Sequence, residues 1–434
     1  MNIFAPLGSL FSTVGYLLSH GGWVVFLFVG LYMLWLLFVL YKENRFIYSH
    51  KWITLAIDVP KENEQTFLAV EQFFAQLHSI HENFTFGEYY FGGERIMWIS
   101  LEIVSFGGQI KYMVHTPEKF LKLIESALYA QYPGAEIRKV EDYMKNLPPY
   151  NAETSYYDLF GTELKLIKED AYPIRTYRAF EHQASQIIVD PLAGVLEALA
   201  TAKPHELIAV QYIIRPIDDD WKESARELVK KLIGTREEAP KKSGIGDIFD
   251  SVLNGILGIF IAAGEAETKK TMVREEPPTL MMHLSPGEKD VVAAIQQNIS
   301  KIGYQTKIRL LYLAPKDKFR KEAKQTMVGA FRQFDDTNLN GLKPDTRKTW
   351  TVVHYKFSKT LETPFVKFLS DRRKKRFIRF FKARSFSKGA KFFILNIEEL
   401  ATVFHFPLVT VKTPQVTKTE ITKGEAPINL PIST

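Results

Sequence analysis

The chain has 434 residues, of which 46% are hydrophobic and 24% are charged, a composition that excludes a wholly disordered protein. It contains no cysteine, which excludes disulfides, cysteine nucleophiles, iron–sulfur clusters and thiolate zinc sites. The net charge is +7, but ten basic residues and no acidic one lie between Arg372 and Lys391, so the remainder of the chain is mildly acidic. The length predicts two or three domains.

Residues 1–41 contain no Asp, Glu, Lys or Arg, and residues 23–41 form an uninterrupted apolar run. A helix of this length extends roughly 28 Å, close to the hydrocarbon thickness of a bilayer. A cleaved signal peptide is the alternative, but it requires a positively charged start and a shorter apolar core. We therefore predict an uncleaved membrane helix over residues 23–41.

The membrane anchor comprises residues 1–49, and its first basic residue, Lys42, follows the apolar run. The positive-inside rule then predicts a single-pass protein of the cell inner membrane, with its N-terminus outside and the bulk of the chain in the cytoplasm. Aromatic residues at both ends of the run suit the two membrane interfaces. The residues that mark the predicted span are Trp23, Phe28, Trp35 and Tyr41.

Residues 50–145 carry the periodicities of a βαββαβ unit. That order of elements is typical of a ferredoxin-like fold. Thr116 is the expected N-cap of the second helix, because Pro117 suits the first helical position. Alternation predicts strands at Trp52–Val59, Met97–Val104, Gln109–His115 and Ala135–Val140, and helical spacing predicts helices over Thr66–Ile80 and Pro117–Tyr132.

A second unit of the same kind is expected over residues 150–235 together with 286–357. Strand patterns occur at Glu163–Ile167, Ile174–Tyr177, Glu206–Ile214 and Gln305–Leu313, and helical patterns at Pro191–Ala202, Ser224–Ile233, Asp290–Ile302 and Lys318–Phe334. The predicted fold class is therefore α+β: a transmembrane helix, two ferredoxin-like α/β sandwich units and an extended C-terminal tail. Residues 358–434 comprise the basic segment and this linker-like tail.

Residues 236–285 interrupt the second unit, and within them residues 245–263 have the pattern of an amphipathic helix. Two interpretations stay open: the helix packs on the core of its own domain, or it lies on the bilayer surface or against a neighbouring subunit. Its apolar face comprises Ile248, Phe249, Val252, Leu253, Ile256, Ile259 and Phe260.

The basic stretch, residues 372–391, is the strongest electrostatic feature of the sequence. Its cations can neutralise nucleic-acid phosphates while the interleaved aromatic residues stack on bases. They can equally hold the anionic inner leaflet, at about 1 kcal/mol for each charge near the surface. A third interpretation is a solvated helix face whose phenylalanines are buried. The residues of this patch are Arg372, Arg373, Lys374, Lys375, Arg376, Arg379, Lys382, Arg384, Lys388 and Lys391.

The sequence contains none of three common catalytic or nucleotide-binding motifs. It contains no GxxxxGK[ST] phosphate-binding loop, no HExxH metal motif and no GxSxG nucleophile motif. His78 and His81 stand three residues apart on a predicted helix, but exposed helix histidines are far commoner than metal ligands. We therefore expect a protein that is not an enzyme, with no catalytic residues, cofactor or metal.

Several segments resemble those of a known family: Ile99–Ile137, Tyr172–Glu181, Asp190–Ile217 and Val328–Asp345. The most specific segment is Leu395–Pro414, followed by Glu425–Pro431. They resemble the membrane-anchored N-terminal region of type IV secretion coupling-type ATPases, the conjugation-associated HerA/TraG-like group of candidate-phylum bacteria. In that family the last two segments lead into the ATPase domain. This chain ends at Thr434, before any nucleotide site, so no ATPase residue is carried over.

The resemblance implies a non-catalytic, membrane-anchored component of a type IV secretion or conjugation-like translocation complex. Such a component scaffolds or recruits a translocation ATPase, and here the P-loop motor is expected on a separate chain, unless this chain is a split or truncated form of the family. The expected partners are the lipid bilayer, that ATPase, and further copies of this chain. DNA is the partner in the alternative, a membrane-tethered nucleic-acid-binding protein that uses residues 372–391.

Overall fold

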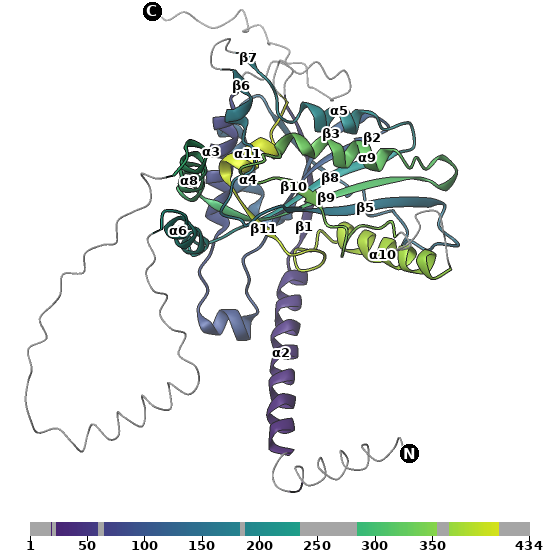
Figure 1. Cartoon of the computed structure of the whole chain (residues 1–434). Helices are drawn as coiled ribbons and strands as arrows, with labels where there is room; N and C mark the ends of the chain where they lie inside the picture. Colours follow the sequence, from purple (N-terminus) through teal and green to yellow (C-terminus); the bar gives the residue numbers. More distant parts are fainter. Residues whose placement is uncertain are drawn as a thin grey trace, which may run out of the picture.

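The computed structural model describes residues 19, 23–59, 65–182, 187–234, 284–353 and 364–407 (Figure 1). Within them, nine strands form one antiparallel sheet with helices on both faces, and a long N-terminal helix projects from the body. The predicted amphipathic helix at residues 245–263 and the chain after residue 407 lie outside the described residues.

The first half of the sheet contains four strands and two helices in the expected βαββαβ succession. The strands lie in the order β2-β3-β1-β4, and each neighbouring pair is antiparallel. The elements are β1 (Trp52–Asp58), α3 (Phe67–Leu77), β2 (Ile99–Phe106), β3 (Gln109–Pro117), α4 (Leu121–Gln131) and β4 (Glu136–Val140).

The N-cap prediction at Thr116 is wrong. β3 continues to Pro117, because β1 pairs with it from Tyr112 to Pro117, and Thr116 is buried opposite Ile53 in that ladder. A short 3-10 turn, Glu118–Phe120, follows before α4 begins. The pairing of two strands thus overrides a local helix-start signal.

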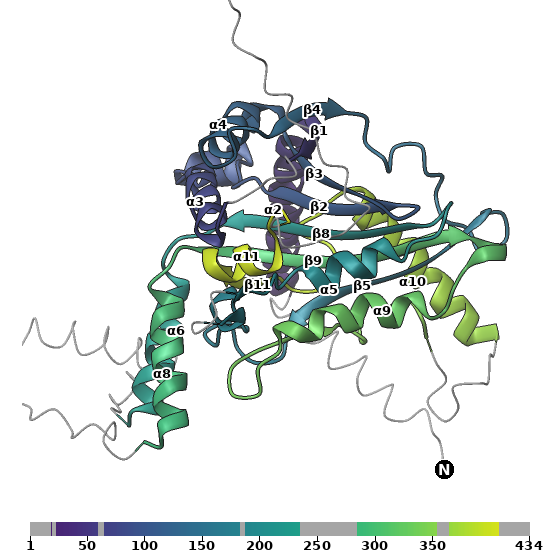
Figure 2. The same cartoon turned by 90° about the horizontal axis from the view of Figure 1, so that it is seen from above.

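The second half repeats the strand arrangement with the order β10-β5-β9-β8, again antiparallel throughout. Between β8 and β9, two helices pack side by side at the edge of the body (Figure 2). The elements are β5 (Tyr157–Leu166), α5 (Ala193–Ala200), β8 (Leu207–Pro216), α6 (Trp221–Leu232), α8 (Pro286–Ile299), β9 (Gly303–Pro315), α9 (Ala323–Gly329) and β10 (Leu342–Pro344), with a separate pair β6 (Glu181–His182) and β7 (Ile187–Ile188).

The predicted strand at Ile174–Tyr177 is wrong as well. Three of its backbone N–H groups form bonds that do not belong to a strand ladder: Ile174 N–H donates to the Glu399 side chain, Tyr177 N–H to the Thr402 hydroxyl, and Arg175 N–H to the carbonyl oxygen of Phe334. A 3-10 turn, Tyr177–Phe180, follows. The segment is therefore extended because it docks on a helix that lies more than 200 residues later in the chain.

The two halves share one sheet. β2 pairs with β8 along their whole lengths, from Ile99 opposite Ile214 to Phe106 opposite Leu207. This pairing covers the edge strand of each half, and exposed edges invite unwanted pairing with other chains. The halves are consequently one body, and Figure 2 shows the strands running side by side across it.

Residues 364–407, which include the predicted basic segment, belong to the folded body, whereas the extended tail is expected after them, outside the described residues. Three elements follow one another there: α10 (Pro364–Lys382), β11 (Phe393–Asn396) and α11 (Ile397–Val403). β11 adds to the sheet by pairing with β9, and α11 is buried against α3. Hydrophobic residues at alternating and helical spacing explain both contacts.

The two faces of the sheet carry different covers. α3, α4, α5, α9 and α11 bury the larger apolar core on one face. α10 covers the opposite face, where Phe377, Phe380 and Phe381 pack on side chains such as Leu159 and Leu311. The N-terminal helix α2 (Trp23–Ser49) projects on the same side as α10, as Figure 1 shows.

Candidate membrane-facing surface

α2 is the one helix among the described residues that is long and apolar enough to cross a membrane, over Phe26–Ser49. Its apolar side chains are exposed all around, with Trp23, Phe28 and Tyr41 each more than half accessible. A helix that is hydrophobic on every side requires either a protein core or lipid around it. Trp35, the fourth residue predicted to mark the span, is partly covered by a loop of the body.

The C-terminal end of α2 is fixed to the body. Ile47 packs on a small cluster formed by Trp98, Ile213 and Phe386, and Phe46 packs on the main core. Since these contacts involve several strands, the direction in which α2 leaves the sheet is set by packing. α2 therefore leads away from the face that α10 covers (Figure 1).

α10 has one buried and one exposed side. Its buried side seats Phe377 over Gly161 of β5, so closely that an added Cβ would lie 2.2 Å from the ring. Its outer side places four of the predicted basic residues in solvent, at helical spacing, together with Phe365 and Phe368, which are 67% and 60% exposed. The exposed basic residues are Arg372, Lys375, Arg376 and Arg379.

Three further residues of the predicted patch are half-buried and bonded within the body. Lys374 forms an ion pair with Asp158 at 2.7 Å. Arg373 donates to the carbonyl oxygens of Trp350 and Arg347, and Lys382 donates to those of Lys145 and Leu147. These cations hold α10 in place and contribute less to an external surface.

Arg384 must be removed from the patch, because it is buried. Its guanidinium lies 3.0 Å from Glu102 and 2.6 Å from Asp142. Lys388 and Lys391 are exposed on the loop 383–392, next to the point where α2 joins the body. Six of the ten predicted cations are thus exposed, all on α10 or the loop after it.

The buried cations and carboxylates of this face form a row across the four central strands. Glu102 of β2, Gln211 of β8, Arg309 of β9 and Glu163 of β5 are successive partners in the sheet register. Arg309 contacts Glu163 at 2.8 Å and Gln211 at 3.2 Å, and Gln211 contacts Glu102 at 3.0 Å. The row therefore links both halves through side chains as well as backbone.

The electrostatics of this row act in opposite directions on Glu102 and Arg309. Burial opposes ionisation of Glu102, but the adjacent Arg384 outweighs that effect and lowers the pKa of the carboxyl. Burial lowers the pKa of Arg309 from its ordinary high value. Arg309 and Lys307 also donate to carbonyl oxygens of the loop 383–392, such as that of Lys388. The row therefore fixes the position of this loop.

Sequence reasoning did not identify this row. The available signal was a charged or amide side chain inside an apolar strand, as in ISLEIVSF of β2 and IRLLYL of β9. Such residues are rarely buried without a partner. Their partners, however, come from strands and loops up to 282 residues away, so the sequence alone did not pair them.

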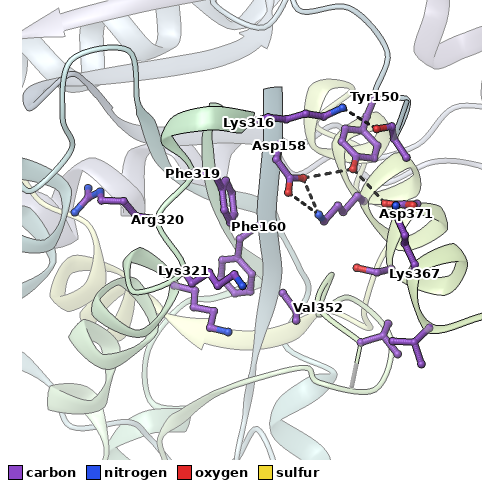
Figure 3. A pocket seen from close by; sticks show the side chains of 16 residues that line it. Tyr150, Asp158, Phe160, Lys316, Phe319, Arg320, Lys321, Val352, Lys367 and Asp371 are labelled. Atoms are coloured by element: carbon purple, nitrogen blue, oxygen red, sulfur yellow. Dashed lines mark hydrogen bonds and ion pairs between the residues drawn. The ribbon is translucent and has the colours of Figure 1, made fainter. Parts of the chain in front are cut away.

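A cleft of about 520 Å³ lies beside the N-terminal part of α10 (Figure 3). On one wall the Tyr150 hydroxyl lies 3.2 Å from Asp371 and 3.4 Å from Asp158, so its single proton is shared between the two carboxylates, and Lys374 bonds to the same Asp158. Burial raises the pKa of the Tyr150 hydroxyl, which is therefore neutral. The rest of the lining combines apolar side chains, such as Phe160 and Phe319, with basic ones, of which Arg320 is paired with Glu206. The other basic residues are Lys316, Lys321, Lys324 and Lys367, and they give the cleft a positive balance.

The histidines considered as metal ligands are engaged otherwise. The ring of His78 bonds to the carbonyl oxygen of Ile217 at 3.1 Å, and His81 lies 3.0 Å from Asp218. In the part of the chain that the structure describes, no three His, Cys, Asp or Glu side chains gather as a metal site would require.

None of the curated proteins matches this chain. One family model does, and its match from residue 47 to residue 419 includes both halves of the sheet, α10 and α11. The chain therefore belongs to the family described as "Domain of unknown function (DUF8128)".

Proposed function

We propose that this protein is a single-pass anchor of the cell inner membrane that holds its α/β body against the cytoplasmic leaflet. The observation that carries the proposal is that α10, whose outer side exposes basic residues, lies on the side of the sheet from which α2 projects, and Figure 1 shows the placement of the two helices. If α2 spans the bilayer with its N-terminus outside, the outer face of α10 is turned toward the inner leaflet. Basic residues next to a span favour that orientation.

The contacts of α2 support a retained anchor rather than a cleaved signal. Ile47 packs on Trp98 and Phe386, and Glu43 lies 3.5 Å from Arg95 of the body. Removal of α2 would expose the apolar side chains that it covers. A signal peptide has no need of such contacts with the mature protein.

Anionic lipid is the ligand that suits the face of α10 best. Each of the exposed cations contributes about 1 kcal/mol near an anionic leaflet, and Phe365 and Phe368 can enter the interface beside them. The phenylalanines expected to stack on nucleic-acid bases, such as Phe377 and Phe381, are buried in the body. This burial argues against the nucleic-acid alternative.

The two halves of the body are, in this proposal, two ferredoxin-like units fused through β2 and β8. Both have the same succession of strands and the same order in the sheet, and the second half carries α6 and α8 as an addition. The resemblance to coupling-type ATPases supports the role of a non-catalytic scaffold that recruits a translocation ATPase of a type IV secretion or conjugation-like complex. In this proposal the helices on the face of the sheet opposite α10, such as α5 and α9, point away from the lipid and can contact such a partner.

The lipid proposal is tested on the full-length chain in nanodiscs. A fluorophore on Ala383→Cys, at the end of α10, should be quenched by a quencher attached to lipid headgroups, more strongly when anionic lipid is present. Charge reversal of Arg372, Lys375, Arg376 and Arg379 to Glu should abolish the dependence on anionic lipid. Reversal of four exposed cations elsewhere on the body should not: Lys122, Lys203, Arg226 and Lys231. Equal loss in both variants would contradict a specific role of α10.

The partner proposal is tested in native membranes by crosslinking and purification of the full-length chain. Recovery of a P-loop ATPase supports the secretion role, and repeated recovery of the chain alone counts against it. Salt-sensitive binding of single-stranded DNA to the purified protein, lost in the α10 reversal variant, would favour the nucleic-acid alternative instead.

A further inference from the structure

A second part of the body reaches along α2. The segment Phe84–Gly93, here called the aromatic loop, connects α3 to β2 and has the sequence FTFGEYYFGG. It extends away from the sheet on the same side as α2 and ends in a π-helical turn, Glu88–Gly92, seen beside α2 in Figure 1. Five of its ten residues are aromatic.

The tip exposes large aromatic rings. Phe86 is 67% accessible, Phe91 is 52% and Tyr89 is 40%. Exposed phenylalanines gathered at the end of a projecting loop are costly in water and mark an interaction site. The loop nevertheless has a defined structure, because the carboxylate of Glu88 accepts hydrogen bonds from the backbone N–H and the hydroxyl of Thr85, both at 2.8 Å.

The aromatic loop contacts the apolar part of α2. Trp35 stacks on Tyr90 at 6.0 Å between ring centroids and meets the edge of Phe91 at 5.7 Å. Phe38 also meets Phe91, at 6.3 Å. The loop thus lies against residues of the run that is proposed to cross the membrane.

The level of these contacts along α2 sets the depth of the loop. Trp35 precedes Lys42, the first charged residue of the chain, by seven residues, which corresponds to roughly 10 Å along a helix. Gly93, where the loop returns, passes so close to the backbone of Lys42 that an added Cβ would lie 2.4 Å from it. The return of the loop is thus level with Lys42, and its tip is level with Trp35 and Phe38.

Polar groups mark where the loop returns to water. Arg95 lies over the ring of Tyr89, 3.5 Å from its centroid, and pairs with Glu43 of α2. An arginine and a glutamate at this level suit the headgroup region, and aromatic rings suit the boundary between headgroups and acyl chains. The Arg95–Glu43 pair thus joins the return of the loop to α2 on the side nearer the body, while the contacts with Trp35 lie farther along α2.

We propose that the aromatic loop inserts into the cytoplasmic leaflet beside α2 and binds lipid with Phe86, Phe91 and Tyr89. This inference rests on the proposed membrane role of α2. The loop is a second, non-spanning attachment, which fixes the rotation of the body about the α2 axis. With two attachments, the outer face of α10 is held toward the leaflet instead of turning freely around a single helix.

The test uses the full-length chain, which has no native cysteine, so that one introduced cysteine carries a spin label at a unique site. Phe86→Cys reports on the loop. Val29→Cys, exposed on α2, is the reference within the bilayer, and Lys122→Cys, exposed on α4, is the reference in water. In nanodiscs, the relaxation of each label by apolar oxygen is compared with its relaxation by a water-soluble nickel complex.

We expect the labels at Phe86→Cys and Val29→Cys to be relaxed preferentially by oxygen, and the label at Lys122→Cys preferentially by nickel. A label at Phe86→Cys that behaves like Lys122→Cys, while Val29→Cys stays in lipid, would overturn the loop proposal alone. If Val29→Cys is also accessible to nickel, the proposed membrane role of α2 fails, and the loop proposal with it. Phe86 is exposed, so its replacement leaves the packing of the body intact.

Discussion

The two faces of the sheet are held by different forces. The face under α3, α4, α5, α9 and α11 is stabilised by a large apolar core, in which burial is non-directional and tolerant of small shifts. The face under α10 combines a smaller apolar cluster with the buried row of Glu102, Gln211, Arg309 and Glu163. Charged hydrogen bonds require defined geometry. The directional hydrogen bonds of the α10 face therefore fix the position of α10 on the sheet more strictly than apolar packing fixes the helices of the other face.

Of the substitutions considered, replacement of the buried cation Arg384 should lower the free energy of unfolding most. Arg384→Met leaves Glu102 buried beside an apolar side chain, and removal of one partner of a buried pair costs about 3–5 kcal/mol. Thermal or urea unfolding of the full-length chain in detergent measures the loss. Arg379→Met, on the exposed side of α10, is the control and should change the free energy of unfolding by less than about 0.5 kcal/mol. Equal effects would show that the buried Arg384–Glu102 pair contributes no more to stability than an exposed cation.

The opposite face offers a pH test. Burial raises the pKa of Glu399, at the start of α11, to about 8, although backbone N–H groups of Asn396 and Ile174 favour its charged form. The folded-state pKa thus exceeds the unfolded value of about 4.3. The stability that Glu399 contributes is complete below that value and is lost as the pH rises to 8, by up to about 1.4 kcal/mol for each pH unit.

Glu399→Gln should remove this slope, because the amide does not ionise. Ile174 N–H donates to one carboxylate oxygen and Asn396 N–H to the other, so the single amide oxygen keeps only one of these bonds and the variant should be less stable at low pH. Unfolding midpoints of wild type and variant at pH 5, 6.5, 8 and 9 are the measurement. The difference in unfolding midpoint between wild type and variant should change with pH up to about 8 and stay constant above it. A constant difference throughout would mean that Glu399 does not titrate in this range.

The close packing of α10 on β5 can be tested with a substitution that should destabilise the fold less. Gly161→Ala places a methyl group against the ring of Phe377 and should destabilise the fold by about 1–3 kcal/mol. The same change in a Phe377→Leu background should cost less, since the smaller side chain leaves room. A double-mutant cycle measures this coupling. Additive effects would show that the ring does not determine the tight approach.

The outer face of α10 should give the smallest effect on stability and a clear effect on lipid contact. Phe365→Ser with Phe368→Ser changes only exposed side chains, so the free energy of unfolding should shift by less than about 0.5 kcal/mol. Quenching of the Ala383→Cys fluorophore by headgroup quenchers should nevertheless fall. A strong loss of stability would instead indicate that these rings are covered in the native protein.

Local patterns predicted the elements whose partners lie nearby, and they missed those whose partners lie far away. The uncharged run gave a long apolar helix, and alternation located the strands of the first half within a few residues. Arg384 stood in a basic run and was grouped with exposed cations, because nothing local indicates Glu102 as its partner. Ile174 resembled a strand residue, although its N–H is bonded to Glu399 of α11.

The candidate surface was predictable only in part for the same reason. The basic residues of α10 are visible in the sequence, but which of them reach solvent depends on how the helix seats on β5 and on the buried row. The aromatic loop has no periodic pattern in the sequence, so its proposed role is indicated only by its contact with Trp35 of α2. In both cases the tertiary contact, not the local composition, decides the role of the residue.

The orientation of the chain across the membrane tests the central claim most directly. Single cysteines at Asn2→Cys, before the apolar run, and at Lys122→Cys, on the body, can be labelled in intact spheroplasts with a membrane-impermeant maleimide. The account predicts that Asn2→Cys is labelled at once and Lys122→Cys only after permeabilisation. Labelling of Lys122→Cys in intact spheroplasts, or recovery of the protein in the soluble fraction without detergent, would contradict it.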